Sequence, residues 1–406
     1  MRRWLPVIVA LGVAGCARPP VPDLLIVNAR VFTNDPARPW AEAVAVKGQR
    51  VVAVGESGAL RQSAGDATRV IDAGGRVLVP GFNDARVDLP REPPTPAGLA
   101  ALDRDAVASG VTSLQVIAGG PMASLVPAAL QAERRARWRL IRSPEDTATL
   151  DTRDPTRVVR QDEEPFLPPQ PGERLDASGI AWTLSGGASA ERRPIAPSRV
   201  ATVVGWAYGA EDPLIVLAGG GRDASRWLDA LAKEGLPQVW QRKRPRLDLA
   251  MSVSAETLPR LRALGVVVTW LPSATRPARW SGPGFPPRFA TTAASGAIAD
   301  AGIPIAAGSA GAPAPMTSLD ALSSAGRAMS GRPLSREDAV RAMTWGSAYA
   351  EKAERDKGWL GPGTLADLTV LSDDIFAAPA ERLPAVASVL TVVGGTIVYD
   401  AGVLSR

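Results

Sequence analysis

The sequence predicts an α/β protein: a (β/α)8 TIM barrel plus a small β-sandwich composite domain formed by both ends of the chain. Two observations predict this fold. Short apolar runs alternate with helical patterns through the middle of the chain, and strand patterns of period two occur at both ends. A barrel of this kind takes about 250 residues, so the 406-residue chain has room for it. We expect the barrel at 78–354 and the sandwich at 23–77 and 355–406.

Eight apolar runs are the expected barrel strands, and their spacing over roughly 270 residues has the rhythm of the fold. Helical patterns lie between them, for example over Ala224–Gly235 and over Ser335–Glu354, where Ser335 and Asp338 form a capping pattern. The expected strands are Leu78–Leu89, Val111–Ile117, Trp138–Ile141, Ile180–Leu184, Leu214–Gly219, Leu247–Val253, Val266–Leu271 and Ile303–Gly308.

The two ends of the chain carry the expected sandwich strands. Ala43–Gly55 alternates as a β-hairpin with its turn at Lys47–Gln49, and Val389–Gly402 does so with a turn at Gly394 and Gly395. Further strands are expected at Leu24–Thr33, Arg69–Ile71 and Ala366–Ser372. Neither end can bury an apolar face alone, so we expect them to pair into one domain.

The N-terminus has the pattern of an export signal. Arg2 and Arg3 precede an apolar run that stops at Cys16, the chain's only cysteine. Val13–Cys16 (VAGC) resembles the lipobox of bacterial lipoproteins, which predicts a signal peptide at 1–15, an acylated Cys16 and a tether at 16–22. The alternative is an ordinary cleaved signal with an incidental cysteine. Either way no free thiol remains for disulfides or cysteine catalysis.

The lipobox resemblance implies an anchor in membrane lipid and a place in the bacterial cell envelope. Ala17, rather than Asp, follows Cys16, which resembles the sorting pattern for the outer membrane, facing the periplasm. The formal charge of +5 falls to +3 without Arg2 and Arg3. This small excess gives no reason to expect nucleic acid as a partner.

One segment carries the frame of a metal-hydrolase motif without its ligands. Val79–Leu89 reads VPGFNDARVDL. It resembles the PGFID-A-H-x-H motif of the amidohydrolase superfamily, in the exported YtcJ-like branch (amidohydrolase 3), where two histidines hold a divalent metal. Arg86 and Asp88 stand at those two positions, and the chain contains no histidine. Gly358–Pro379 resembles the passage that ends the same family's barrel.

The resemblance implies three further metal or catalytic positions, and all have changed. The family's HAIGDRA corresponds to LAGGGRD, which places Leu217 at a ligand histidine and keeps Arg222. R-I-E-H-A corresponds to Arg246–Ala250, which places Leu249 at another histidine. G-S-D corresponds to Gly308–Ala310, so Ala310 replaces the carboxylate that activates water. The family's strand-four lysine falls near Ala181. These changes predict no metal and no cofactor.

The vacated positions allow a structural hypothesis. Residues two apart on a strand face the same side, so Arg86 and Asp88 should both face the barrel interior. We expect the guanidinium of Arg86 to take roughly the former cation volume and to be neutralised by Asp88 or another inward acid. If Leu249 points into the barrel, Asp248 should point away from it.

The sequence gives weaker support for two other kinds of catalytic site, one based on serine and one on carboxylates. Ser309 and Ser185 lie at strand ends, but the chain has no G-x-S-x-G elbow and no His, and a Ser–Lys pair would need Lys243. Asp84 and Asp88 are too few for a hard-cation site or a glycosidase pair.

Two possible pocket residues, Arg222 and Ser309, lie at the ends of expected barrel strands. The glycine-rich turn before Arg222 opens a helix and suggests an anion site, although a tight turn explains it as well. Ser309 is the other, with backbone capping as the simpler reading. The Pro-rich connection 143–179 is either a lid or a disordered insertion.

These observations predict an exported amidohydrolase-like lipoprotein that has lost its metal site. The expected role is that of a pseudoenzyme that binds an unknown small ligand or an envelope protein. The alternative is an active hydrolase of carbon–nitrogen (non-peptide) bonds in amide substrates at a non-canonical site, with zinc or another divalent metal.

Overall fold

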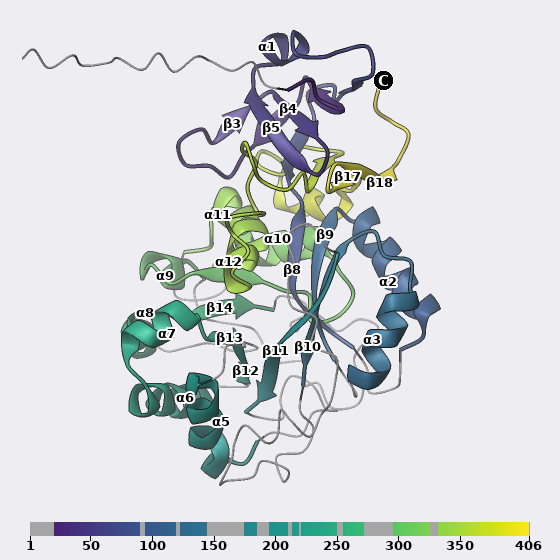
Figure 1. The fold of residues 1–406 in the computed structure, drawn as a ribbon. Helices are drawn as coiled ribbons and strands as arrows, with labels where there is room; N and C mark the ends of the chain where they lie inside the picture. The colour runs from purple at the N-terminus through teal and green to yellow at the C-terminus, as the bar shows by residue number, and fades with distance from the viewer. Residues whose placement is uncertain are drawn as a thin grey trace, which may run out of the picture.

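The structure is a computed structural model, and it describes residues 20–89, 94–118, 122–143, 174–184, 195–209, 213–218, 221–249, 255–271, 295–324 and 332–405. The expected signal at 1–15, Cys16 and most of the 143–179 connection lie outside these residues. Figure 1 shows a barrel with a β-domain stacked on one of its ends. The predicted fold class, a TIM barrel with a separate β-domain, is confirmed.

The barrel is an eight-stranded sheet in the order β15-β14-β13-β12-β11-β10-β9-β8, with parallel neighbours throughout. Its two end strands meet where Ala310 N donates to Arg86 O at 2.8 Å. Each expected run overlaps one barrel strand. The strands are β8 (Phe82–Asp88), β9 (Val111–Ile117), β10 (Arg137–Arg142), β11 (Leu175–Thr183), β12 (Leu214–Ala218), β13 (Arg246–Leu249), β14 (Val267–Trp270) and β15 (Ile305–Ala307).

Helices cover the outside of the barrel and bury its main apolar core. Ser335 caps α11 by accepting from Asp338 N at 3.0 Å, as the capping pattern predicts. The helices are α2 (Pro96–Ala108), α3 (Met122–Gln131), α5 (Val200–Gly209), α6 (Gly221–Glu234), α7 (Pro237–Lys243), α8 (Leu258–Ala263), α9 (Ser295–Asp300), α10 (Pro315–Ser324), α11 (Arg336–Arg341), the π-helix η6 (Ala342–Gly346) and α12 (Ser347–Ala350).

The β-domain consists of two sheets that share an apolar core between them. One sheet has the order β5-β4-β1-β6 and the other β18-β17-β16-β7-β2-β3, so strands from both chain ends pair in the second. The expected hairpins are present. The elements are β1 (Leu24–Val27), β2 (Arg30–Phe32), β3 (Trp40–Ala41), β4 (Ala43–Lys47), β5 (Arg50–Gly55), α1 (Ser57–Arg61), β6 (Arg69–Asp72), β7 (Val77–Pro80), β16 (Leu368–Leu371), β17 (Ser388–Val393) and β18 (Thr396–Asp400).

The expected strand Leu78–Leu89 is in fact two strands in two different sheets. It breaks at Gly81, where β7 of the β-domain passes into β8 of the barrel. Pro80 contributes to this break because it has no N–H to continue a ladder. Gly81 N donates to Asp367 O of the β-domain at 2.9 Å.

The β-domain packs against the N-terminal ends of the barrel strands. Arg137, at the start of β10, binds Asp367 through two hydrogen bonds of 2.7 and 3.1 Å. Thr391 of β17 donates to Val107 O in the last turn of α2, the helix that leads into β9. The C-terminal ends of the strands therefore point away from the β-domain, toward the lower part of Figure 1. Within the described residues, no helix has the length and apolar character needed to cross a membrane.

Candidate functional site

A buried network of charged side chains occupies the interior of the barrel, and Arg86 is its centre. Only 1% of the Arg86 side chain is exposed. Its Nε and Nη2 donate to the two carboxylate oxygens of Asp88 at 2.8 and 2.9 Å, and its Nη1 donates to Asp248 Oδ2 at 2.6 Å. We expected Asp88 or another inward acid to neutralise Arg86, and in the structure Asp88 and a second acid both bind it.

The second acid is Asp248, and its orientation corrects a prediction. We expected Asp248 to point away from the barrel interior, but its side chain is 0% exposed and contacts Arg86 from the non-adjacent strand β8. Arg246, on the same face of β13, binds both oxygens of Asp248 at 2.7 and 2.9 Å and donates to Gln115 Oε1 of β9 at 2.6 Å. Side chains from β8, β9 and β13 can meet only across the interior, so Asp248 faces it.

The charges in this network hold one another ionised. Burial by itself lowers the pKa of Arg86, but the negative charges of Asp88 and Asp248 outweigh burial and raise it. Burial by itself raises the pKa of Asp248, but Arg246 and Arg86 outweigh burial and lower it. Arg86 and Asp248 therefore stay charged within the hydrogen-bonded ion pairs that they make with Asp88 and Arg246. Removing one member of such a buried pair costs about 3–5 kcal/mol, although a buried pair is not by itself a net stabiliser.

The other positions at which the family places ligands carry apolar side chains. Leu217 is buried on β12, on the face it shares with Ile215 inside the barrel. Ala181 is buried on β11 beside Ile215. Leu249 is the last residue of β13, and the structure describes its backbone only. Ala310 has a left-handed backbone (φ 55°) and closes the seam between β15 and β8.

Asp84 and Ser309 connect the first and last barrel strands. Asp84 Oδ1 accepts from Ser309 N at 2.9 Å and from Arg86 N at 3.1 Å. Ser309 Oγ donates to Gly311 O at 3.0 Å. Burial raises the pKa of Asp84 to about 6 against these hydrogen bonds. Both side chains therefore hydrogen-bond to backbone groups where β8 and β15 meet, in agreement with the prediction of backbone capping for Ser309.

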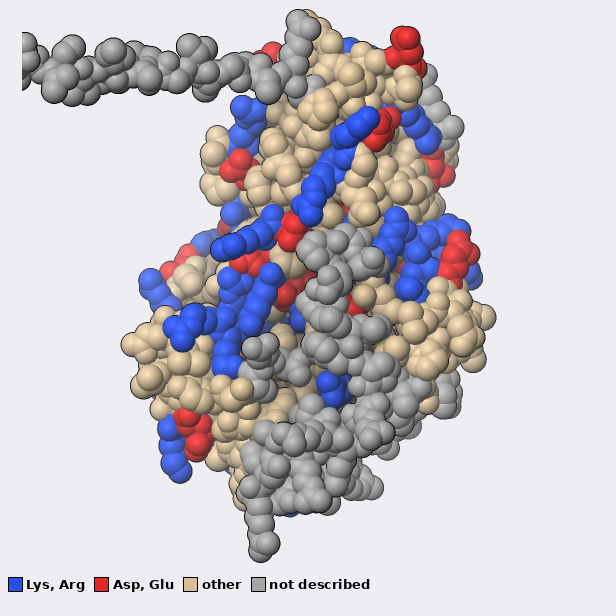
Figure 2. Space-filling view, viewed as in Figure 1, with Lys and Arg blue, Asp and Glu red and all other residues tan. Residues whose placement is uncertain are grey.

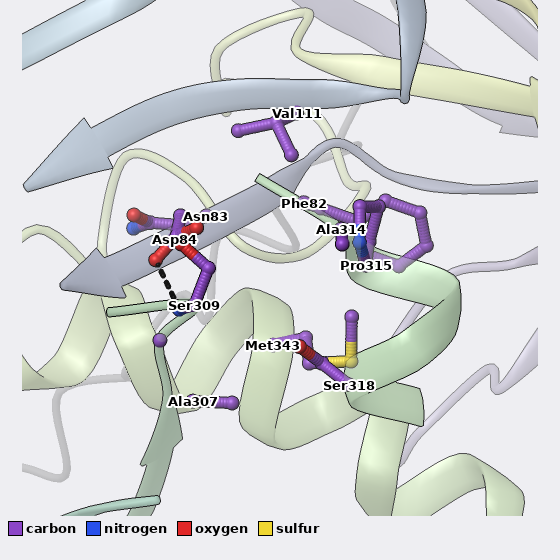
Figure 3. A pocket seen from close by; sticks show the side chains of 11 residues that line it. Phe82, Asn83, Asp84, Val111, Ala307, Ser309, Ala314, Pro315, Ser318 and Met343 are labelled. Carbon is purple, nitrogen blue, oxygen red and sulfur yellow. Dashed lines mark hydrogen bonds between the residues drawn. The ribbon is translucent and has the colours of Figure 1, made fainter. Parts of the chain in front are cut away.

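A small cavity lies beside this seam, and Figure 3 shows Asp84 and Ser309 on its wall. Its volume is about 20 Å³, which is room for one water molecule rather than a substrate. Phe82 and Ala307 also belong to the core outside the strands, so the cavity lies outside the barrel. The lining residues are Phe82, Asn83, Asp84, Val111, Ala307, Gly308, Ser309, Ala314, Pro315, Ser318 and Met343.

A Ser–Lys contact exists at the opposite end of the barrel interior, but it is not a catalytic pair. Lys357 Nζ donates to Ser113 Oγ at 2.9 Å and lies 2.6 Å from Glu351 Oε1. Burial by itself raises the pKa of Glu351, but Lys357 and Arg139 outweigh burial and lower it. Lys357 is therefore held as the counter-ion of Glu351, and its contact with Ser113 belongs to this ion pair.

Arg222 and the remaining serine candidate lie apart from the network. Arg222 is exposed in the first turn of α6, beyond the end of β12. Ser185 lies outside the described residues, and Lys243 ends α7 on the outer helical layer. The structure therefore brings together Arg86 and Asp88 of the predicted site residues, and Ser309 beside them across the seam.

The residues present do not fit a divalent cation. A hydrolytic metal site needs three or more donors with an open coordination position. Here the first ligand position holds a buried cation, and both oxygens of Asp88 bind it. In the part of the chain that the structure describes, no three His, Cys, Asp or Glu side chains gather closely enough to hold a metal ion.

Sequence reasoning missed two members of the network, Arg246 and Gln115. The available signal was a polar residue inside an apolar strand: Gln115 in Val111–Ile117, and the i, i+2 pair of Arg246 and Asp248. Such pairs face the same side of a strand, which makes an ion pair along β13 predictable. Which residues meet it from other strands was not predictable from this spacing.

The model of the Amidohydrolase family (Amidohydro_3) matches residues 98–399, about three quarters of the chain. Two curated proteins match over short stretches. Protein LONG AFTER FAR-RED 3 of Arabidopsis thaliana is 36% identical over 69 residues, which are 17% of this chain and 12% of that protein. N-substituted formamide deformylase of Arthrobacter pascens is 43% identical over 63 residues, 16% of this chain and 12% of that protein. Each match thus spans only a small part of the curated relative.

Solved structures share the fold over nearly the whole chain. An uncharacterized metal-dependent hydrolase from Pyrococcus furiosus has a TM-score of 0.65 at 15% identity, covering 87% of this chain and 99% of that one. Atrazine chlorohydrolase TrzN from Arthrobacter aurescens TC1, complexed with zinc, has a TM-score of 0.64 at 17% identity, covering 93% and 95%. An adenosine deaminase from Xanthomonas campestris with bound zinc has 0.65 at 17%, covering 94% of each. Identities this low show the fold alone.

Proposed function

This chain belongs to the amidohydrolase family, and we propose that it is a pseudoenzyme of that family, an exported lipoprotein that binds a ligand or partner instead of hydrolysing one. The observation that carries the proposal is the Arg86 side chain, which is 1% exposed and bound by Asp88 and Asp248. A protonated guanidinium repels a divalent cation and cannot donate a lone pair to it.

Among the interior residues that the structure describes, the side chains that activate water in a hydrolytic barrel are also missing. A metal-bound water needs the cation and a base close to it. Ala310 offers no proton acceptor, and Asp84 is committed to the backbone of Ser309 and Arg86. These features support the proposal that the barrel has kept its fold and lost hydrolytic activity.

A binding role would use Asp88, which stands at the accessible end of the ion network beside an apolar layer of the interior. The inward residues of four neighbouring strands form a separate apolar cluster: Ile117, Ile141, Ala181 and Ile215. Asp88 is 18% exposed and is the network's most accessible member. The four apolar side chains are at most 3% exposed, so the group of this interior that a ligand at the mouth would meet is the Asp88 carboxylate. We propose anchoring in the bacterial cell envelope through acylated Cys16, on the lipobox pattern alone.

Metal analysis and a hydrolysis screen test the loss of activity together. The full chain is purified, its zinc, iron and manganese contents are measured, and N-acyl amino acids and N-substituted formamides are assayed with and without added zinc. We expect substoichiometric metal and no turnover above that of the Arg86→Leu variant. Stoichiometric metal together with turnover that disappears in Asp88→Asn would instead establish the alternative, an active carbon–nitrogen hydrolase.

A further inference from the structure

We propose that, in the acylated protein, the face of the β-domain around Val21 and the turn after α1 lies against the membrane, while the barrel mouth faces the aqueous compartment. The inference rests on the lipid anchor of the proposed function and adds the orientation of the folded protein relative to the membrane. It makes the partner of the mouth a water-soluble molecule or protein and not a lipid of the same bilayer.

The described chain begins on the surface of the β-domain beside α1 (Figure 1). Pro22 O accepts from Thr68 Oγ1 at 2.7 Å, and Asp23 N donates to Val46 O at 2.8 Å. Val21 is 54% exposed and lies against Gly65, in the segment between α1 and β6. The position at which the chain leaves the folded body is therefore fixed by contacts up to Val21.

The anchor is too short to let the other end of the molecule reach the bilayer. Seven peptide steps separate Cys16 from Asp23, and a chain extends at most about 3.6 Å per residue, so the reach is about 25 Å. A folded chain of this length has a radius of gyration of about 21 Å and is about 50 Å across. The face around Val21 must therefore lie close to the lipid.

The mouth lies at the opposite end because of how the strands run. The sheet that contains β1 packs on the second sheet of the β-domain, and that domain meets the barrel at the N-terminal strand ends, through Asp367 and Arg137. The C-terminal ends of the barrel strands, with Asp88 on β8, point away from both sheets (Figure 1).

The membrane-proximal face has balanced charge. Lys47 pairs with Asp23 at 2.7 Å, and Arg61 and Arg69 lie 3.6 and 3.9 Å from carboxylates of the same domain. In the view of Figure 2, Lys and Arg side chains on the upper lobe lie beside Asp and Glu side chains, and larger groups of Lys and Arg lie lower, at the waist and on the barrel flank. A polybasic segment gains about 1 kcal/mol per unpaired cation from anionic lipid. This face offers no such excess, so attachment should depend on the acyl group and not on salt.

Depth-dependent fluorescence quenching on vesicles tests the orientation. Cys16 is the only cysteine and is acylated in the anchored form, so each added cysteine can be labelled alone. Ala67→Cys lies beside the chain exit, Arg104→Cys on α2 at the flank, and Arg222→Cys near the mouth, and all three positions are exposed. The labelled acylated proteins are bound to phosphatidylethanolamine and phosphatidylglycerol vesicles that carry a nitroxide on the headgroup. The Cys16→Ser form of each variant is the unanchored control.

We expect quenching to be strongest at position 67, intermediate at 104 and weakest at 222. Vesicle binding should persist when salt rises from about 0.1 M to about 1 M, which shortens the Debye length from about 10 to about 3 Å. Equal or reversed quenching in bound protein would overturn the orientation and leave the anchor intact. Release by salt would overturn the neutral docking face. Failure of the acylated chain to float with vesicles would overturn the anchor itself, and this inference with it.

Discussion

Replacing Arg86 with leucine should destabilise the protein by about 3 kcal/mol, which is the lower end of the range for breaking a buried ion pair. The lower end applies for two reasons. Asp248 keeps both hydrogen bonds from Arg246, and Asp88, which loses its contacts with Arg86, is 18% exposed and partly solvated. Unfolding entropy is about 2.1 cal/mol/K per residue. For the 384 residues from Asp23 to Arg406 (406 − 22) this gives about 0.8 kcal/mol/K. The expected fall in Tm is therefore about 4 °C.

Thermal unfolding of three variants tests whether the loss of a buried ion pair, and not the substitution of an arginine as such, lowers the Tm. Arg382→Leu breaks an exposed pair with Asp373, whose side chains are 68% and 36% exposed, and should cost under about 1 kcal/mol. Arg86→Leu combined with Asp88→Asn should regain part of the lost Tm, because it also removes a negative charge that Arg86 compensates in the wild type. If Arg86→Leu melts like Arg382→Leu, the guanidinium does not hold the barrel interior together and the reasoning is refuted.

Three further predictions concern the seam and the opposite end of the barrel. Burial raises the pKa of Asp84 to about 6, so the native state binds a proton that the unfolded chain has already lost. Wild-type stability should therefore fall by about 2 kcal/mol relative to Asp84→Asn as pH rises from about 4 to about 6. Parallel urea titrations that show no such difference would disprove this. The pKa of Glu351 is lowered, despite burial, by Lys357 and Arg139. Glu351→Gln should therefore be less stable than wild type at neutral pH, and the deficit should vanish as pH falls through the lowered pKa, measured by thermal melts over pH. A Cβ on Gly308 would lie 2.6 Å from a backbone nitrogen of β8, so Gly308→Ala should cost about 1–3 kcal/mol. Gly311→Ala, whose Cβ meets nothing within 4 Å, is its control, and equal denaturation midpoints would count against a tight seam.

The barrel strands could be predicted from the sequence because the signal for each is local. Val111–Ile117 was expected as a strand and is β9 with the same bounds. The prediction failed where one apolar run pairs with strands of two different sheets. Leu78–Leu89 is one apolar run, yet Gly81 divides it between the two sheets. Strand β11 begins at Leu175, before the expected Ile180, because pairing with β10 extends it through polar residues.

The site was predictable in part. The loss of imidazole ligands, and the inward direction of Arg86 and Asp88, followed from residue types and from the two-residue period. Asp248 was wrongly predicted to point away from the interior, because its direction was inferred from the alignment of its neighbour Leu249 with a ligand position. What decides it is a charge on another strand: Asp248 faces the interior, where Arg86 and Arg246 compensate its buried charge.

The sequence by itself determined the fold class and removed every imidazole from the chemistry, since strand periodicity and composition are properties of the chain alone. Only the tertiary structure decided how the vacated interior is filled. Arg86 and Asp248 are 162 residues apart, and their contact exists because the barrel brings non-adjacent strands to one enclosed space. A charge enclosed there has no water to solvate it, so its partner must come from whichever strand the closed sheet places opposite.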